Sequence, residues 1–274
     1  NHSEISSIKQ TVTQIISTIN DPGSSAKDLK RIIEVDPPLT AKLLRLANSA
    51  KYGYPKTISE IQEAIICIGF DAVREVALSQ KVCELFENDT YISGYSRASL
   101  WKHCVGVALC SKLIYRREFK EHGNTTYVAG LLHDIGIIVL DQFFHDKFVE
   151  ILKTATKHRK NCIEIENDML GFDHTDIARA LAENWGFPDP ITKAIELHHD
   201  PELDEDDSNK IPSVIYLADN IVQNKLIGYN DAPNVSKLLY SRCLRKLNIK
   251  EKAVEFIARE TVKEINSMKK AGWF

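Results

Sequence analysis

Apolar residues recur at intervals of three and four along most of the chain, whereas the alternation of apolar and polar residues that marks strands is scarce. This spacing is typical of amphipathic helices, so the sequence predicts an all-α fold. Proline, glycine and aspartate turns separate the apolar stripes. The helices expected from these signals cover residues 6–20, 26–35, 39–49, 59–69, 70–86, 235–247 and 251–268, and others begin near Leu100, His174, Pro190 and Pro212.

The polar segment at residues 87–96 is the best candidate for a domain boundary. It separates a helical N-terminal lobe, residues 1–94, from a second helical lobe, residues 95–230. The two lobes are expected to pack on each other. A helical extension at residues 231–274 is expected to cover that second lobe. The N-terminal lobe offers no nucleophile, glycine-rich phosphate loop or cluster of acids, so we expect it to serve as an interaction platform.

Polar residues occupy helix positions that would otherwise hold apolar side chains. His103 shares a helix face with Val107. Asp219 falls in the same way between Ile215 and Val222. Because an isolated carboxylate is costly to bury, an inward Asp219 requires a partner.

Three more histidines follow this pattern. His198 lies on the apolar stripe of the helix that begins after Pro190, and His199 is beside it. His174 opens another amphipathic helix, whose start either Asp173 or Thr175 is able to cap. Helices from distant parts of the chain are therefore expected to direct polar side chains into a common interior.

His133 and Asp134 are adjacent, with Gly130 before them and Gly136 after them. The small neighbours allow another backbone or a bound ion to approach closely. Side chains of successive residues diverge by about 100° on a helix, so the pair reaches a shared ion only from a helix end or when it serves two ions.

These positions together form one candidate metal site. Its proposed ligands are His103, His133, Asp134, His174, His198, His199 and Asp219. A single histidine on an apolar face is more often a core residue that donates to a backbone carbonyl, but that explanation requires a separate partner for each member of the set. Imidazole and carboxylate ligands favour Fe, Mn, Zn or Ni, or Mg where carboxylate and water dominate, without selecting one. The remaining histidines, His2, His122, His145 and His158, are expected at the surface.

Several of these segments resemble a known superfamily. Residues 131–136, Leu-Leu-His-Asp-Ile-Gly, together with His103 and Asp219 resemble the HD superfamily of metal-dependent phosphohydrolases. His174, His198 and His199 resemble its binuclear branch, which cleaves cyclic dinucleotides. Residues 33–39, 43–50 and 61–69 are similar to the HDOD domain, a bacterial signalling relative of that superfamily.

The resemblance implies roles for single residues. In HD enzymes the residues that match His103, His133, Asp134 and Asp219 hold the catalytic ion, and those that match His174, His198 and His199 complete a second ion position. A catalytic role, if the site turns over, would fall to His133 and Asp134.

Two departures from the enzyme pattern argue against turnover. Ile137 stands where the binuclear phosphodiesterases carry a lysine, and residues 200–207 are mostly acidic where those enzymes carry Gly-Tyr-Pro. Phosphodiester hydrolysis requires positive groups around the phosphate oxygens, and Ile137 supplies none. Lys102, Arg179 and Lys193 are cations that would compensate if they projected into the site.

Composition limits the cellular location and the partners that are expected for the chain. No apolar run approaches the roughly eighteen residues of a membrane span, and the first residues, Asn1 to Glu4, show no signal region. The 6 cysteines lack Cys-x-x-Cys spacing, so we expect reduced packing residues and a cytoplasmic location. A net charge of -3 gives no basic field for a nucleic-acid partner.

These observations predict a bacterial signal-transduction protein whose HD-like site binds one or two divalent ions and which passes its state to a protein partner. The first alternative is a metal-dependent phosphohydrolase, with a nucleotide or cyclic dinucleotide as its ligand. The second alternative is an interaction scaffold without metal.

Overall fold

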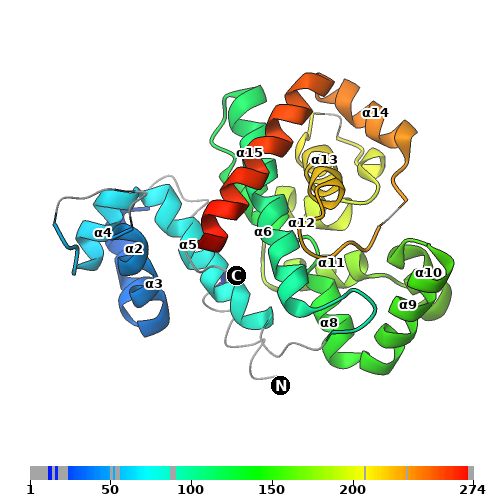
Figure 1. Cartoon of the computed structure of the whole chain (residues 1–274), viewed down its shortest axis with the longest axis horizontal. Coiled ribbons are helices and arrows are strands. Elements are labelled where there is room, and N and C mark those ends of the chain that lie inside the picture. Colours follow the sequence, from blue (N-terminus) through cyan, green and yellow to red (C-terminus); the bar gives the residue numbers. More distant parts are fainter. Residues whose placement is uncertain are drawn as a thin grey trace. The chain divides into compact units, whose positions relative to one another are not determined.

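The predicted all-α fold is confirmed. The computed structural model describes residues 12–13, 16–17, 24–49, 52, 56–86, 91–206, 208–232 and 234–270. Within these ranges the regular elements are helices, apart from an isolated bridge between Ile92 and Tyr95 (Figure 1). The helix expected at residues 6–20 lies, but for residues 12–13 and 16–17, outside the described residues.

The chain divides into two compact units. Unit 1 comprises residues 1–85 and 269–273, and unit 2 comprises residues 86–268 and 274. The boundaries expected at residues 94 and 230 stay predictions. Each unit is described by itself below.

Unit 1 is built from four helices that pack on one another among its described residues. They are α2 (Ala26–Glu34), α3 (Pro37–Ala47), α4 (Ile61–Ile68) and α5 (Phe70–Cys83), and the short turn η1 (Glu84–Phe86) follows. Helix α3 begins at the predicted Asp-Pro turn because the Asp36 carboxylate accepts the N–H of Leu39 at 3.0 Å. Asn48 ends the helix, since its side chain donates to the carbonyl of Leu44, and it also bonds both backbone groups of Ile58.

Unit 2 holds the other helices. These are α6 (Arg97–Ile114), the π-helical turn η2 (Tyr115–Phe119), α7 (Asn124–Leu132), α8 (Ile135–Phe143), α9 (His145–His158), α10 (Cys162–Leu170), α11 (His174–Asn184), α12 (Asp189–Glu196), the turn η3 (Pro201–Leu203), α13 (Ile211–Asn224), α14 (Lys237–Lys246) and α15 (Glu251–Lys270). Helix α6 packs against α7 and α13, and α12 contacts α7, α11 and α13. Helices α6, α7, α12 and α13 thus surround one interior, each in contact with at least two of the others.

Glycines set the closest approaches inside unit 2. A Cβ atom on Gly130 of α7 would lie 2.9 Å from Cα of Ala108 on α6. A Cβ atom on Gly136 of α8 would lie 1.9 Å from the carbonyl oxygen of His174 on α11. The close approach expected around His133 is therefore confirmed, because only glycine leaves room for these backbones.

The cysteines are free, and Cys104, Cys110, Cys162 and Cys243 are buried, which agrees with the expected packing role. Among the described residues, none of the individual helices combines the length and apolar character needed to cross a membrane. One bent pair of segments, Asn124–Phe143 and His145–His158, meets those criteria when its two parts are taken together across a 118° break.

Candidate metal centre

The turn between α7 and α8 carries the adjacent pair His133 and Asp134. His133 caps the C-terminus of α7, and Asp134 precedes the first residue of α8. The pair therefore sits at a helix end, where neighbouring side chains escape the helical divergence, and Nε2 of His133 lies 3.2 Å from Oδ2 of Asp134. Both side chains are buried.

A first cluster of ligand atoms forms on one side of this pair. His103 of α6 places its Nε2 atom 3.3 Å from Nε2 of His133 and 3.0 Å from Oδ1 of Asp219 on α13. The ligand atoms of these three residues lie within 4.8 Å of one another. Asp219 is 3% exposed, so this carboxylate points inward as the helix pattern predicts.

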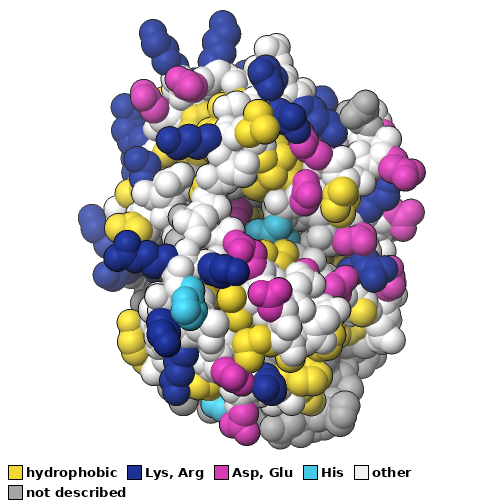
Figure 2. Space-filling view, turned by 90° about the vertical axis from the view of Figure 1, so that its right-hand side faces the viewer, with side chains coloured by type: hydrophobic (Ala, Val, Ile, Leu, Met, Phe, Trp, Pro, Cys, Tyr) yellow, Lys and Arg dark blue, Asp and Glu magenta, His cyan; other side chains and the backbone are white. Residues whose placement is uncertain are grey.

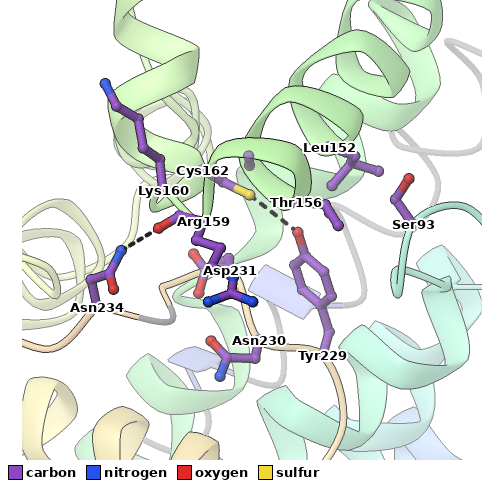
Figure 3. Close-up of a pocket in the computed structure, with 11 residues that line it drawn as sticks. Ser93, Leu152, Thr156, Arg159, Lys160, Cys162, Tyr229, Asn230, Asp231 and Asn234 are labelled. Atoms are coloured by element: carbon purple, nitrogen blue, oxygen red, sulfur yellow. Dashed lines mark hydrogen bonds between the residues drawn. The ribbon is translucent and has the colours of Figure 1, made fainter.

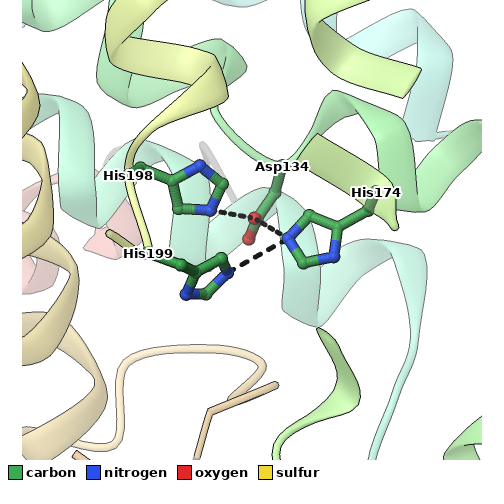
Figure 4. Close-up of side chains that lie close together, drawn as sticks. All are labelled: Asp134, His174, His198 and His199. Atoms are coloured by element: carbon green, nitrogen blue, oxygen red, sulfur yellow. Dashed lines mark hydrogen bonds and ion pairs between the residues drawn. The ribbon is translucent and has the colours of Figure 1, made fainter. Parts of the chain in front are cut away.

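A second cluster forms on the other side (Figure 4). It combines Asp134 with His174 at the start of α11 and with His198 and His199, which follow α12. Nε2 of His174 lies 3.1 Å from Nε2 of His199 and 3.7 Å from Oδ1 of Asp134. Nε2 of His198 lies 3.4 Å from the same carboxylate oxygen.

Asp134 joins the two clusters. Its Oδ1 atom faces His174 and His198, whereas its Oδ2 atom lies 3.6 Å from Nε2 of His103 and 3.2 Å from Nε2 of His133. The structure therefore brings all seven predicted residues together. A carboxylate between two groups of imidazoles is the geometry that two neighbouring cations require of a bridging ligand.

Three of the imidazole rings are oriented through their outer nitrogen. In each ring Nδ1 lies at hydrogen-bond distance from an oxygen, which directs the Nε2 lone pair into the cluster when Nδ1 carries the proton. The bonds join His133 to Gly130 O (2.8 Å), His198 to Ile195 O (2.7 Å) and His174 to Glu166 Oε2 (2.7 Å). The pairing of His174 with Glu166 is the carboxylate–histidine arrangement that supports metal ligands.

Several buried atoms in the cluster lack hydrogen-bond partners among the described residues. They are both carboxylate oxygens of Asp134, Nε2 of His198, Nδ1 of His103 and Oδ2 of Asp231. An unpaired buried polar atom costs roughly 1–3 kcal/mol, and more when it is charged. The donor set and its unpaired inward atoms therefore fit a bound cation.

The pKa values of the histidines in the site are shifted in opposite directions. Burial opposes protonation, but the carboxylate of Asp219 outweighs it and raises the pKa of His103 to about 9. Glu166 acts in the same way on His174 and raises its pKa to about 10. Burial and the neighbouring His199 lower the pKa of His198 to about 4. Proton-binding and proton-free imidazoles thus lie side by side.

Burial by itself would raise the carboxyl pKa values in the cluster, but the histidines outweigh that effect. The imidazole of His133 holds the pKa of Asp134 well below its ordinary value. The pKa of Asp231 is lowered to about 2, chiefly through His199. Both carboxylates are therefore ionised near neutral pH and present negative charge to the interior.

The structure adds three residues that the sequence analysis missed. Asp231 lies in the loop after α13, where no periodic pattern marks an inward position. Gln223 follows Asp219 by one helical turn and donates to both of its oxygens, so its spacing was a usable signal. Glu166 is fully buried on α10, one position after the buried Ile165.

Cys104 also lies near the cluster, although its sequence context predicts only packing. Its thiol is within 4.8 Å of ligand atoms of His133 and Asp134. Burial and the charge of Asp134 raise the pKa of the Cys104 thiol well above its ordinary value. A protonated thiol is a weak ligand, so the imidazoles and carboxylates are the better donors.

The structure also places the residues that depart from the phosphodiesterase pattern, and two of the cations that would compensate for them. Ile137 is 1% exposed. Arg179 pairs with Glu196 at 3.4 Å, and Lys193 pairs with Asp204 at 3.3 Å, so both cations have acidic partners within the fold. The acidic segment is not simply solvated, because Asp204 is buried and accepts a hydrogen bond from the side chain of Asn209.

The histidines outside the set behave as expected where they are described. His122, His145 and His158 are exposed, and His2 lies outside the described residues. Within the set, the side chain of His199 is 15% exposed, whereas that of His198 is fully buried. Figure 2 shows a histidine at the bottom of a hollow, with acidic side chains nearby.

A family model for the HDOD domain matches residues 5–201. The chain belongs to the HDOD family. The matched segment of this HDOD protein contains six of the seven predicted ligands, and Asp219 follows it. The resemblance drawn from the sequence is confirmed.

Solved structures share the fold of this HDOD protein. An HDOD domain protein of unknown function from Geobacter sulfurreducens is 26% identical with a TM-score of 0.81, and the match covers 94% of this chain and 90% of that one. A candidate signal transduction protein from Marinobacter aquaeolei VT8 is 23% identical with a TM-score of 0.77, over 96% of this chain and 58% of that one. A candidate phosphohydrolase from Shewanella amazonensis SB2B is 21% identical with a TM-score of 0.68, and the match covers 93% of this chain and 88% of that one.

A curated relative from Treponema pallidum (strain Nichols), an uncharacterized protein, is 23% identical over 224 residues. That match covers 78% of this chain but 41% of the relative. The HDOD protein therefore spans about two fifths of the length of that relative.

Proposed function

We propose that this HDOD protein is a metal-binding signalling protein that holds one or two divalent ions in unit 2 and passes the state of that site to a protein partner. One observation carries the proposal. The ligand atoms of seven residues predicted from the sequence converge in one buried cluster, and both oxygens of Asp134 there lack a hydrogen-bond partner among the described residues.

Charge supports a cation in this cluster. Three carboxylates, those of Asp134, Asp219 and Asp231, are each at most 3% exposed. Like charges at such short range in a poorly solvated interior repel one another strongly. One divalent ion would offset two of these three negative charges and two ions would offset all of them, while the imidazoles around them supply further donor atoms.

The first ion position would be held by His103, His133, Asp134 and Asp219, and the second by Asp134, His174, His198 and His199. When bound, such ions supply Lewis acidity and lower the pKa of a bound water. Glu166 would orient His174, and Gln223 would orient Asp219. The donor set accepts Fe, Mn, Zn, Ni or Mg.

The proposed signalling partner is a protein. Unit 1 carries large apolar side chains on its surface, with Val35 78% and Ile66 73% exposed. A contiguous exposed apolar patch marks a protein contact, so the proposed partner would bind where such side chains adjoin. This role is compatible with a chain that spans only part of its curated relative.

Elemental analysis tests the metal proposal directly. Protein purified without a histidine tag is expected to contain between one and two equivalents of a divalent metal per chain, and added metal is expected to raise its melting temperature after chelation. A chelated protein that gains no stability from any of these ions, and contains none when purified, would be the metal-free scaffold instead.

The pH dependence of ion binding follows from the raised histidine pKa values. At about pH 7 His103 (pKa about 9) and His174 (pKa about 10) carry protons that an ion must displace, whereas His198 (pKa about 4) does not. Burial opposes protonation of His199 as well, but Asp231 outweighs it and raises the pKa of His199, so an ion displaces at least two protons. The apparent affinity should therefore rise at least roughly 100-fold per pH unit near neutrality and keep rising until about pH 9. Calorimetry in buffers of different ionisation enthalpy would count these protons. An affinity that levels off above about pH 7, as for ordinary histidines, would contradict this.

A second candidate function, phosphohydrolysis of a nucleotide or cyclic dinucleotide, is favoured by a pocket of about 420 Å³ beside the cluster. Asp231 belongs to both, and Arg159 and Lys160 also line the pocket. Figure 3 shows the guanidinium group of Arg159 between Asp231 and Asn230. Arg159 places a cation beside the metal cluster, which suits an anionic ligand, whereas the ammonium group of Lys160 lies 3.8 Å from the Glu164 carboxylate.

Turnover is tested with metal-loaded protein and a panel of nucleotides and cyclic dinucleotides. Hydrolysis that Asp134→Asn abolishes, and that Arg159→Ala weakens, would establish the enzyme. Hydrolysis that survives Asp134→Asn does not come from this site. If the fully metal-loaded protein hydrolyses none of these compounds, only the metal-binding role remains.

A further inference from the structure

Asp231 lies in the loop that follows α13 and reaches the second cluster. Its Oδ2 atom is 3.4 Å from Nε2 of His199 and 3.9 Å from Nε2 of His174. The residue is 3% exposed, and Oδ2 has no hydrogen-bond partner among the described residues. A buried carboxylate oxygen that approaches two imidazole nitrogens without bonding to either has the surroundings of a metal ligand.

The backbone around Asp231 is fixed on two sides. A Cβ atom on Gly228, where φ is +80°, would lie 2.3 Å from the carbonyl oxygen of Ser99, so only glycine brings the loop this close to α6. The next residue, Tyr229, donates its N–H to that same carbonyl at 3.0 Å. On the other side the N–H of Cys162 donates to the carbonyl of Asp231 at 2.8 Å. The carboxylate is thus held in place before any ion arrives, which lowers the entropy cost of binding.

Gln223 orients the Asp231 side chain. Its Nε2 atom donates to Oδ1 of Asp231 at 3.1 Å and to both oxygens of Asp219, at 2.9 and 3.1 Å. One amide therefore links a carboxylate of the first cluster to a carboxylate beside the second. Because Gln223 occupies Oδ1, the Oδ2 atom of Asp231 is the one turned toward His174 and His199.

We propose that Asp231 is a ligand of the second ion position, together with Asp134, His174, His198 and His199. This assignment rests on the metal binding proposed above. Two structural explanations for the buried charge are weaker. His199 is an ion-pair partner of Asp231, but at 3.4 Å this contact leaves Oδ2 without a hydrogen bond of good geometry. Asp231 makes no ion pair with Arg159 among the described residues, although both line the same pocket.

The assignment has a chemical consequence for the second position. Three imidazoles and the shared Asp134 bring at most one negative charge to a divalent ion, and Asp231 would bring a second one. A more anionic, oxygen-containing donor set shifts preference toward harder ions such as Mn or Fe relative to a purely imidazole set. Because Asp231 also lines the 420 Å³ pocket, a molecule in that pocket would lie beside this ligand (Figure 3).

The experiment measures metal content and affinity for Mn and Zn in the full chain. Asp231→Asn keeps the size of the side chain and the acceptor for Gln223 but removes the charge. We expect at least a tenfold loss of affinity at one ion position, with the other position unchanged. Asp204→Asn is the matched control, since Asp204 is also buried but contacts Lys193 and Asn209 instead of the cluster. It should bind metal like wild type.

The outcomes separate this inference from the metal proposal. Wild type that binds no ion overturns both. Wild type that binds metal, while Asp231→Asn retains the same number of ions within threefold of the wild-type affinity, overturns the role of Asp231 alone. If Asp231→Asn fails to fold, wild-type crystals soaked with Mn decide: an anomalous peak about 2.0–2.4 Å from Oδ2 supports the assignment, and peaks only beyond about 3 Å overturn it.

Discussion

Asp134→Asn is expected to abolish ion binding at both positions. The two oxygens of Asp134 face different clusters, one toward His174 and His198 and the other toward His103 and His133. Replacement of a residue that only supports a ligand costs about 10- to 100-fold in affinity, so loss of a bridging ligand should cost at least about 100-fold at each position. Metal content after dialysis and competition with a chromophoric chelator would measure this.

The same variant also has a stability readout. An ion at 100 times its dissociation constant stabilises the folded wild type by about 2.7 kcal/mol, which for a unit of this size corresponds to about 5–10 °C in melting temperature. Asp134→Asn should show no such gain, whereas Asp204→Asn should show all of it. A variant that retains one ion at wild-type affinity would mean that Asp134 serves a single position.

Gly136→Ala is expected to destabilise unit 2 by more than about 3 kcal/mol. The new Cβ atom would lie 1.9 Å from the carbonyl oxygen and 2.8 Å from the carbonyl carbon of His174. Both atoms are backbone, so no side-chain rotation relieves the clash, and α8 must separate from α11. Alanine in a helix favours folding by roughly 0.5–1 kcal/mol over glycine, which is too little to offset this. Urea unfolding of the isolated variant would measure the loss.

Gly186→Ala supplies the comparison. Its Cβ atom would have no heavy atom within 4 Å, but its φ of +69° is unfavourable for alanine. We expect a cost of about 1–2 kcal/mol from the backbone alone. Equal losses in the two variants would show that the contact between α8 and α11 relaxes easily. Gly136→Ala should in addition weaken the second ion position, because the clash displaces His174.

The sequence predicted those parts of the fold and site that repeat with helical period. His103 and Asp219 were placed inward because each shares a stripe with aliphatic residues, and both are at most 3% exposed. Helix starts marked by proline or an acidic cap were also found, as at α3 and α11. Such signals are local, and helix formation depends mainly on local spacing and capping.

The residues that were missed act through tertiary structure. Asp231 follows Gly228 and Tyr229 in a loop, and only the packing of that loop on Ser99 and Cys162 turns its carboxylate inward. The resemblance implied that the ligands divide between two ion positions, but only the structure shows that Asp134 faces both clusters, with one oxygen toward each. Spacing along one helix carries no information about either arrangement.

The ligands of the proposed centre enter from α6, the α7–α8 turn, α11, the segment after α12, α13 and the loop that follows it, between residues 103 and 231. A cation there would act as a noncovalent cross-link among stretches of chain that are synthesised at different times. Tight binding of the ion would require that the whole stretch of chain carrying these ligands has reached its native fold. Occupancy would therefore report the integrity of the domain core, which is the kind of information that the proposed signalling role requires.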